Sequence, residues 1–397
     1  MQIEDRPTIK NQTPENKLLG GFTVDRNALF SVLKRHAGVV ENSHSIKALA
    51  GVRICLEDGS ITMTVSNGDL EIVSRVPIAD MTLGVGFELC LHFRKMYDIC
   101  RLFSDDEPIR FSVLDNKWVT IKSGRADFKL ALLDVATFPT MPTERAKHDL
   151  YLKVSDLSKL LDMTSFCMGV QDVRFYLNGL LFEVRNGQAS AFSSDGHRLA
   201  IFELKREKMD THDFSMLIPR RAVSEISKVS REGSHDAKCR LEVSAKYLVI
   251  SFESCVMRIV LLQAPPLNYR SLLPKERSEA VSVSRQELLS SLSRCMILSH
   301  EKFSKVQLTV EKDAFSLMSR NLEHERISDN LGATYNGSSL TVSCNVYYLH
   351  EASAALDRED MDIYFFGLNH ALCLEDEQDD YHVTYIIMPL SIDERCA

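Results

Sequence analysis

The feature that most constrains the fold of this chain is an internal repeat. Val24, Val154 and Val283 each end an apolar run and are followed by an Asp or a Ser suited to cap a helix, and then by apolar residues at helical spacing. The three valines are 130 and 129 residues apart (154 − 24 and 283 − 154). A repeat of this length predicts consecutive copies of one folding unit.

A second helical pattern repeats in step with the first. It is centred near Ile99, Ile226 and Ala352, which are 127 and 126 residues apart. Between the helices lie short alternating runs bounded by Asp-Gly, Asn-Gly or Asp-Asn pairs, which are signals of β-hairpins. The sequence therefore predicts an α+β fold of three modules, each with two helices and about eight strands. A parallel-sheet enzyme fold is disfavoured, because helices do not alternate with single strands.

Polar linkers at 143–149 and 274–280 indicate where the modules meet. The predicted organisation is a disordered polar tail at 1–20, modules at 21–145, 146–274 and 275–392, and a short tail at 393–397. No run approaches the ~18 apolar residues of a membrane-spanning helix, and the N-terminus lacks the apolar core of a signal peptide. We expect a cytoplasmic protein without membrane contact.

The residues that could hold a metal or cofactor are scattered. The ten cysteines include no pair at the close spacing of a zinc site, so we expect reduced, mostly buried thiols. No glycine-rich phosphate loop is present. The acidic run at 375–380 lacks the alternating spacing of a calcium loop and is predicted to be a solvated hairpin tip. We expect no cofactor and no metal.

The distribution of charge bears on binding to nucleic acid. A net charge of −8 argues against a DNA-binding protein, because phosphate contacts need Lys and Arg. The six predicted helix windows, however, carry a net charge of +5, so the rest of the chain carries −13. This asymmetry fits helices that face phosphates and sheets that face solvent, although ordinary solvated helix surfaces would also explain it.

Two short segments invite functional interpretations. In Ser194-Asp195-Gly196-His197 the residue types of a hydrolase triad occur together, but neighbours on a turn point apart and no Gly-x-Ser-x-Gly pattern is present. A turn in which Asp195 caps backbone amides is the favoured interpretation. The segment 385–390 is apolar and contains a proline; it is either the last strand of module three or the wall of a peptide groove.

Four segments resemble the bacterial beta sliding clamp of DNA polymerase III. They are DVRFYLNGLLFEV…SSDGHRLA, NYRSLLP, MILSHEKF and YIIMPL, and the resemblance runs from residue 21 to 392. It implies a non-catalytic DNA clamp fold in which two subunits close head to tail into a ring of six modules around double-stranded DNA of any sequence. It also implies that the catalytic subunit of the polymerase, the clamp loader, other polymerases and repair proteins dock short linear peptides between modules two and three.

The resemblance implies roles for three sets of residues. The peptide pocket would contain Leu177, Ser194, Gly196, His197, Arg198, Leu199, Leu267, Leu272, Tyr348, Ile386, Met388, Pro389 and Leu390. Contacts to DNA would come from Arg94, Lys95, Arg101, Gln171, Tyr176, Arg220, Arg221 and Lys228. The dimer interface would set Phe128 and Leu130 of one chain against Ile297 and Leu298 of the other.

The chain also departs from the family pattern. Leu267 stands where a Pro is usual, and Ser271 and Ser391 stand where the pocket rim usually has Arg. Loss of two positive charges predicts a shifted or weaker peptide preference. Two rival functions stay open from the sequence: a monomeric peptide-binding scaffold, and a hydrolase that uses Ser194, Asp195 and His197.

Overall fold

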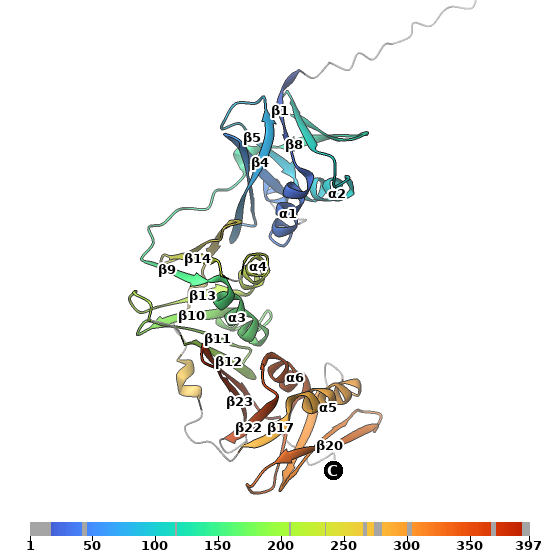
Figure 1. The fold of residues 1–397 in the computed structure, drawn as a ribbon, viewed down its shortest axis with the longest axis vertical. Coiled ribbons are helices and arrows are strands. Elements are labelled where there is room, and N and C mark those ends of the chain that lie inside the picture. The colour runs from blue at the N-terminus through green and yellow to red at the C-terminus, as the bar shows by residue number, and fades with distance from the viewer. Residues whose placement is uncertain are drawn as a thin grey trace, which may run out of the picture. The chain divides into compact units, whose positions relative to one another are not determined.

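The computed structural model describes residues 17–41, 46–115, 117–205, 208–234, 236–264, 268–273, 280–299, 304–366 and 371–390. The chain forms two compact units. The first comprises the residues up to 143 together with 254–258, and the second comprises 144–253 and the residues from 259 onward. Figure 1 follows the elements along the chain. The predicted tails and the pocket residue Leu267 lie wholly or mostly outside the described residues.

The first unit contains two helices and eight strands. The elements are β1 Leu18–Val24, α1 Arg26–His36, β2 Gly51–Glu57, β3 Ser60–Ser66, β4 Leu70–Met81, β5 Glu88–His92, α2 Phe93–Leu102, β6 Ile109–Leu114, β7 Trp118–Ser123 and β8 Ala126–Leu133. The strands are antiparallel neighbours in the order β1-β6-β7-β8-β5-β2-β3-β4, and β1 also pairs with β4. Helices α1 and α2 pack against each other.

The second unit repeats this composition twice. Its first half holds β9 His148–Lys153, α3 Val154–Thr164, β10 Gly179–Arg185, β11 Gln188–Ser194, β12 Arg198–Leu204, β13 Phe214–Pro219, α4 Arg220–Ser230, β14 Lys238–Val243 and β15 Tyr247–Ser251, and β16 Val256–Val260 follows in the chain, with its residues up to 258 counted in the first unit. Its second half holds β17 Val281–Ser284, α5 Arg285–Ile297, β18 Lys305–Glu311, β19 Ala314–Arg320, β20 Arg326–Thr334, β21 Leu340–Asn345, α6 Val346–Ala355, β22 Asp360–Phe366, β23 Ala371–Glu377 and β24 Tyr381–Ile387. The prediction of two helices and about eight strands for each module is confirmed.

One sheet runs through both halves of the second unit. Its strand order is β13-β10-β11-β12-β24-β23-β22-β17-β20-β19-β18-β21. The junction is the antiparallel pairing of β12 with β24, from Arg198 opposite Ile387 to Leu204 opposite Tyr381. Helices α3 and α4 pack against each other, as do α5 and α6 (Figure 1). This continuous sheet fixes modules two and three relative to each other.

Helix starts follow the predicted capping pattern in two modules of the three. The side chain of Asp25 accepts the N–H of Ala28, and that of Ser284 accepts the N–H of Glu287. In module two the prediction that Ser155 is the cap is wrong, because α3 begins one residue earlier, at Val154. Its N-cap is Lys153, which makes no capping hydrogen bond through its side chain. Packing of the apolar face therefore stabilises this helix start without a cap.

The described cysteines are free, and all except Cys55 are buried. Burial raises the pKa of Cys90 and Cys100 to about 12, which keeps these thiols protonated. In the described ranges no group of His, Cys, Asp and Glu is arranged to hold a metal ion. Nor does that part of the chain contain a helix long and apolar enough to span a membrane.

The acidic run at 375–380 lies at the hairpin between β23 and β24 and exposes Glu377 and Asp379, as predicted, but Asp376 departs from the prediction. Strand β23 continues to Glu377, and Asp376 is fully buried, with 0% of its surface exposed. Its carboxylate accepts the hydroxyl of Tyr381 (2.9 Å) and the side-chain amide of Gln378 (2.8 Å), and pairs with Nε of Arg358 (3.3 Å). The prediction failed at Asp376 because two neighbours in the hairpin and the more distant Arg358 together stabilise its buried carboxylate.

Asp376→Ala should therefore lower the free energy of unfolding of the second unit by about 2–4 kcal/mol, because it leaves the buried hydroxyl of Tyr381 and the Arg358 guanidinium without an acceptor. Urea denaturation followed by circular dichroism measures the change. The matched control is Asp379→Ala, in the same hairpin, where the side chain is exposed. Equal effects of the two substitutions would contradict a structural role for the buried carboxylate.

Candidate functional site

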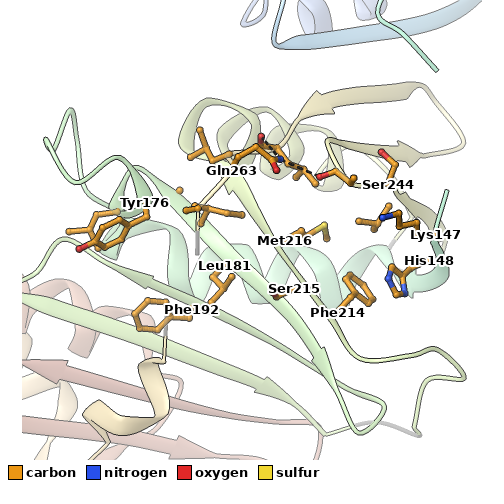
Figure 2. Close-up of a pocket in the computed structure, with 18 of the residues that line it drawn as sticks. Lys147, His148, Tyr176, Leu181, Phe192, Phe214, Ser215, Met216, Ser244 and Gln263 are labelled. Carbon is orange, nitrogen blue, oxygen red and sulfur yellow. Dashed lines mark hydrogen bonds between the residues drawn. The ribbon is translucent and has the colours of Figure 1, made fainter. Parts of the chain in front are cut away.

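The second unit contains a cavity of about 260 Å³. It is lined by Lys147, His148, Tyr176, Leu177, Gly179, Leu181, Phe192, Ser194, Phe214, Ser215, Met216, Leu217, Val243, Ser244, Ala245, Leu261, Leu262, Gln263 and Ala264. Figure 2 shows its labelled lining residues spread from Tyr176 at one end to Lys147 and His148 at the other. Of the twelve expected pocket residues that the structure describes, Leu177 and Ser194 line this cavity and the other ten do not.

An apolar cluster forms the floor at one end of the cavity. It joins Leu181, Phe192, Leu199, Ile201, Tyr269, Ala371, Cys373 and Ile386, and Leu217 packs against it. Leu181, Phe192 and Leu217 also line the cavity, whereas Leu199 and Ile386 lie buried beneath it. These two expected pocket residues therefore support the floor. Because β12 pairs with β24, the floor draws on both module two and module three.

The turn between β11 and β12 is held together by its own polar groups. The carboxylate of Asp195 accepts the N–H groups of His197 (2.9 Å) and Arg198 (3.0 Å). The hydroxyl of Ser194 accepts the N–H of Gly196 and donates to the carbonyl of Arg198. These bonds engage Ser194 and Asp195 within the turn, so the serial Ser–His–Asp hydrogen bonding of a triad is not formed.

Gly196 is required at its position in this turn. Its φ angle is +90°, a value that side-chain-bearing residues rarely adopt. A Cβ atom here would also lie 2.6 Å from the guanidinium of Arg174. Arg174 in turn donates to the carbonyl of Asp195 (3.2 Å) and pairs with Asp172 (2.9 Å). Arg174, which no pattern in the sequence singled out, places a cation beside the turn and the exposed His197.

Arg198 connects module two with module three. Its guanidinium lies 4.2 Å from the ring centroid of Tyr348, forms ion pairs with Asp195 and Glu351, and donates to the carbonyl of Phe166. Arg198 and Tyr348 were both expected in the pocket, and the structure brings them together. Because the donors of Arg198 are already engaged, this side chain stabilises the junction of the modules.

The segment 385–390 is in part the last strand of module three, as one of the two interpretations of the sequence proposed, and none of its residues lines the cavity. Up to Ile387 it is a buried strand, and the hydroxyl of Tyr385 donates to the carbonyl of Met163 (2.8 Å). Beyond the strand, Met388 and Leu390 are exposed and Pro389 is half-buried. The N–H of Met388 donates to the carbonyl of His197 (2.8 Å), so this exposed end lies beside the turn.

The loop after β16 contributes the remaining expected pocket residue within the described part. Leu272 is exposed, and its neighbour Ser271 donates its hydroxyl to the carbonyl of Asn268 (2.7 Å). Tyr269, which the sequence analysis did not select, is buried against Phe192, with ring centroids 4.8 Å apart. Ser391 lies outside the described residues.

Strands β8, in the first unit, and β20, in the second, each have an edge that is unpaired over most of its length. Strand β8 pairs with β7 over 126–131 but with β5 only at Leu132 and Leu133. Strand β20 pairs with β19 over 326–332 but with β17 only at Ala333 and Thr334. Over the rest of their length, neither strand has a second partner in the described part of the chain. Open edges of this kind pair readily with another strand.

Apolar side chains of the expected dimer interface lie near these edges. On β8, Phe128 is 37% exposed and Leu130 is half-buried. At the end of α5, Ile297 is 80% exposed and Leu298 is half-buried. Helix α5 packs on β20. Exposure of large apolar residues beside an open strand edge is typical of a protein–protein interface.

The residues expected to contact DNA occupy two helices and a loop. On α2, Arg94, Lys95 and Arg101 are exposed, and both arginines pair with Asp98. On α4, Arg221 and Lys228 are exposed, and Lys228 pairs with Glu225. Arg220 instead donates to the carbonyl of Met168 (2.7 Å), so it positions the loop that follows α3.

That loop, residues 169–177, has buried ends and an exposed middle that carries three apolar side chains. Val173 is 97% exposed, and Val170 and Phe175 are also exposed. Gln171 has a positive φ of 53°, and the loop is braced by the side chain of Asn178, which bonds to both the N–H and the carbonyl of Asp172. Tyr176, expected at DNA, lines the cavity (Figure 2).

Comparison with known proteins agrees with this geometry over nearly the whole chain. Family models of the N-terminal, central and C-terminal domains of the DNA polymerase III beta subunit match residues 21–142, 151–265 and 270–391. A beta sliding clamp of Pseudomonas aeruginosa is 29% identical over 371 residues, covering 94% of this chain and all of the relative. One of Escherichia coli strain K12 is 26% identical, with the same coverage.

Solved structures give the same result. The crystal structure of a P. aeruginosa sliding clamp bound to griselimycin superposes with a TM-score of 0.87 at 28% identity, covering 94% of this chain and 100% of the other. The sliding clamp of Bartonella birtlesii bound to griselimycin also gives 0.87, at 27% identity and the same coverage.

Proposed function

The chain belongs to the DNA polymerase III beta subunit family, and we propose from its own surfaces how it acts as a sliding clamp. Two copies join head to tail around double-stranded DNA, and the ring keeps the replicative polymerase on its template. The chain catalyses no reaction, since its contribution is enclosure and docking. It acts in the cytoplasm, where the bacterial chromosome is copied.

The open strand edges are the main observation that supports the proposal of a ring. Each copy offers one edge on β8, in the first unit, and another on β20, in the second. If β8 of one copy pairs with β20 of the next, two copies use all four edges and the assembly closes. Phe128 and Leu130 then meet Ile297 and Leu298, so apolar surface is removed from water beside the new strand pairing.

The proposed DNA surface consists of the cations of α2 and α4 and the loop 169–177. Most of its described arginines and lysines have carboxylate or carbonyl partners within the protein. Such cations bind phosphates weakly, because each phosphate contact competes with an internal one. Weak, sequence-independent contacts suit a protein that is held by enclosure and must slide.

The proposed docking site for partner proteins is the cavity above the apolar cluster together with the exposed Leu272, Met388 and Leu390. An apolar concavity with a few polar groups on its walls fits a short linear peptide. Beside the turn at Gly196 the site has one cation, Arg174, which pairs with Asp172. The rival function, a monomeric peptide-binding scaffold, would keep this site but leave the strand edges unpaired.

The test of the ring is retention on DNA of different topology. Labelled protein is loaded on a nicked circular plasmid by the clamp loader and separated from free protein by gel filtration in high salt. Bound protein should stay on the circle, because enclosure is not screened by salt, and it should leave after one restriction cut. Equal retention on circular and linear DNA, or a monomeric mass in solution, would overturn the proposal.

A further inference from the structure

The cavity is longer than the apolar floor beneath it. Leu181 and Phe192 line the end that lies over the apolar cluster. The lining then continues past Met216 and Phe214 to Lys147, His148 and Ser244, none of which belongs to that cluster (Figure 2). The second end is polar and has no role in the function proposed so far.

The groove between these ends follows the edge of a sheet. Strand β13 is the terminal strand of its sheet and pairs with β10. On its other side the only partner in the described part of the chain is Leu262, whose N–H donates to the carbonyl of Leu217 (3.0 Å). Alternate residues of a strand turn their backbone groups to the same side. Ser215, two residues before Leu217 and exposed, therefore offers its N–H and carbonyl to an added strand.

The polar end of the groove carries a positive charge. Lys147 is exposed, and no carboxylate within the described ranges forms an ion pair with it. The two acidic residues nearest to this end in sequence have other partners, since Asp149 pairs with Arg240 and Asp213 accepts the N–H of Asn186. The ring of His148 stacks on Phe214, with centroids 4.4 Å apart.

The surroundings of His148 disfavour its charged form. Burial, followed by the nearby His212 and Lys147, lowers its pKa below the usual value. The ammonium group of Lys147 is therefore the charge that a ligand would meet. Since His148 stacks on Phe214 and Leu217 packs on the apolar cluster, the two ends are about three residues apart along β13, or about 10 Å.

We propose that this groove binds an extended peptide of a partner protein whose apolar side chains fill the Leu181–Phe192 end and whose acidic side chain pairs with Lys147. The backbone of the peptide lies along β13 and bonds to Ser215. The spacing between the apolar and acidic residues is about three to five positions, set by the rise of an extended chain. The proposal rests on the proposed docking function and specifies the class of peptide that this site selects.

The test uses fluorescein-labelled synthetic peptides that contain a Leu-Phe pair in a Gly/Ser background. One Glu is moved position by position along either side of the pair, and each peptide has a counterpart with Gln in place of Glu. Fluorescence anisotropy with the full-length protein at low salt gives the dissociation constants. We expect the best-spaced Glu peptide to bind about five-fold more tightly than its Gln counterpart, and the difference to shrink as salt is added.

Lys147→Glu should abolish the preference for Glu over Gln and leave binding of the Gln peptides within about two-fold. The matched control is Lys238→Glu, an exposed lysine on β14 that does not line the groove, which should keep the preference. Binding of Glu and Gln peptides with equal affinity would overturn the acidic-peptide proposal while the docking site stands. If no Leu-Phe peptide binds at all, the docking site itself is refuted.

Discussion

Ile297→Asp should convert the dimer into monomers at micromolar concentration. Ile297 is 80% exposed at the end of α5, beside the open edge of β20. In the proposed ring it is covered by Phe128 and Leu130 of the other copy, so the substitution places a carboxylate in an apolar contact. The cost is about 3 kcal/mol at each of the two interfaces, or about 6 kcal/mol for the ring, which weakens dimerisation about 10⁴-fold.

Sedimentation velocity over a range of concentrations measures this effect. The control is Tyr151→Asp, which introduces the same charge at an exposed aromatic residue on β9, a strand whose partner is β14. The Ile297→Asp monomer should still bind Leu-Phe peptides but should not be retained on circular DNA. An unchanged dimer would refute the assignment of this interface, and a monomeric wild-type chain would favour the scaffold function.

The first unit should lose stability as the pH falls below about 6.5. His36 is fully buried, and burial, reinforced by the charge of Arg35, lowers its pKa to about 3. Nε2 of His36 lies 3.0 Å from the hydroxyl of Ser74. An unfolded chain binds a proton at this residue near pH 6.5, whereas the folded chain binds it only near pH 3. Stability is therefore complete above pH 6.5 and decreases as the pH falls through this window.

The expected loss from His36 is about 1.4 kcal/mol for each pH unit, or about 2 kcal/mol at pH 5. Urea denaturation at several pH values between about 7 and 5 measures the slope. His36→Gln should flatten it whatever its effect on stability at neutral pH, because Gln does not titrate. His212→Gln, at an exposed histidine, is the control. An unchanged slope in His36→Gln would show that this residue does not control acid sensitivity.

At the turn Ser194–Arg198, some contacts could be predicted from the sequence and others could not. The residues Asp195 and Gly196 alone indicated a turn in which the carboxylate caps backbone amides, and those bonds are present. The contacts of Arg198 with Glu351 and Tyr348 could not be predicted from the sequence, because those partners lie about 150 residues away along the chain. The same residue was expected as a pocket residue and proved to connect two modules.

The sequence by itself determined the three-module repeat, the two helices in each module and the capping residues Asp25 and Ser284, because these features depend on the spacing of neighbouring residues. Only the tertiary structure decided that Asp376 is buried, that β8, β13 and β20 have open edges, and that Lys147 stands at the end of a groove that begins at Leu181. These features depend on which distant strands become neighbours. Strand pairing is selected by packing across the whole unit, and no local pattern of residues encodes it.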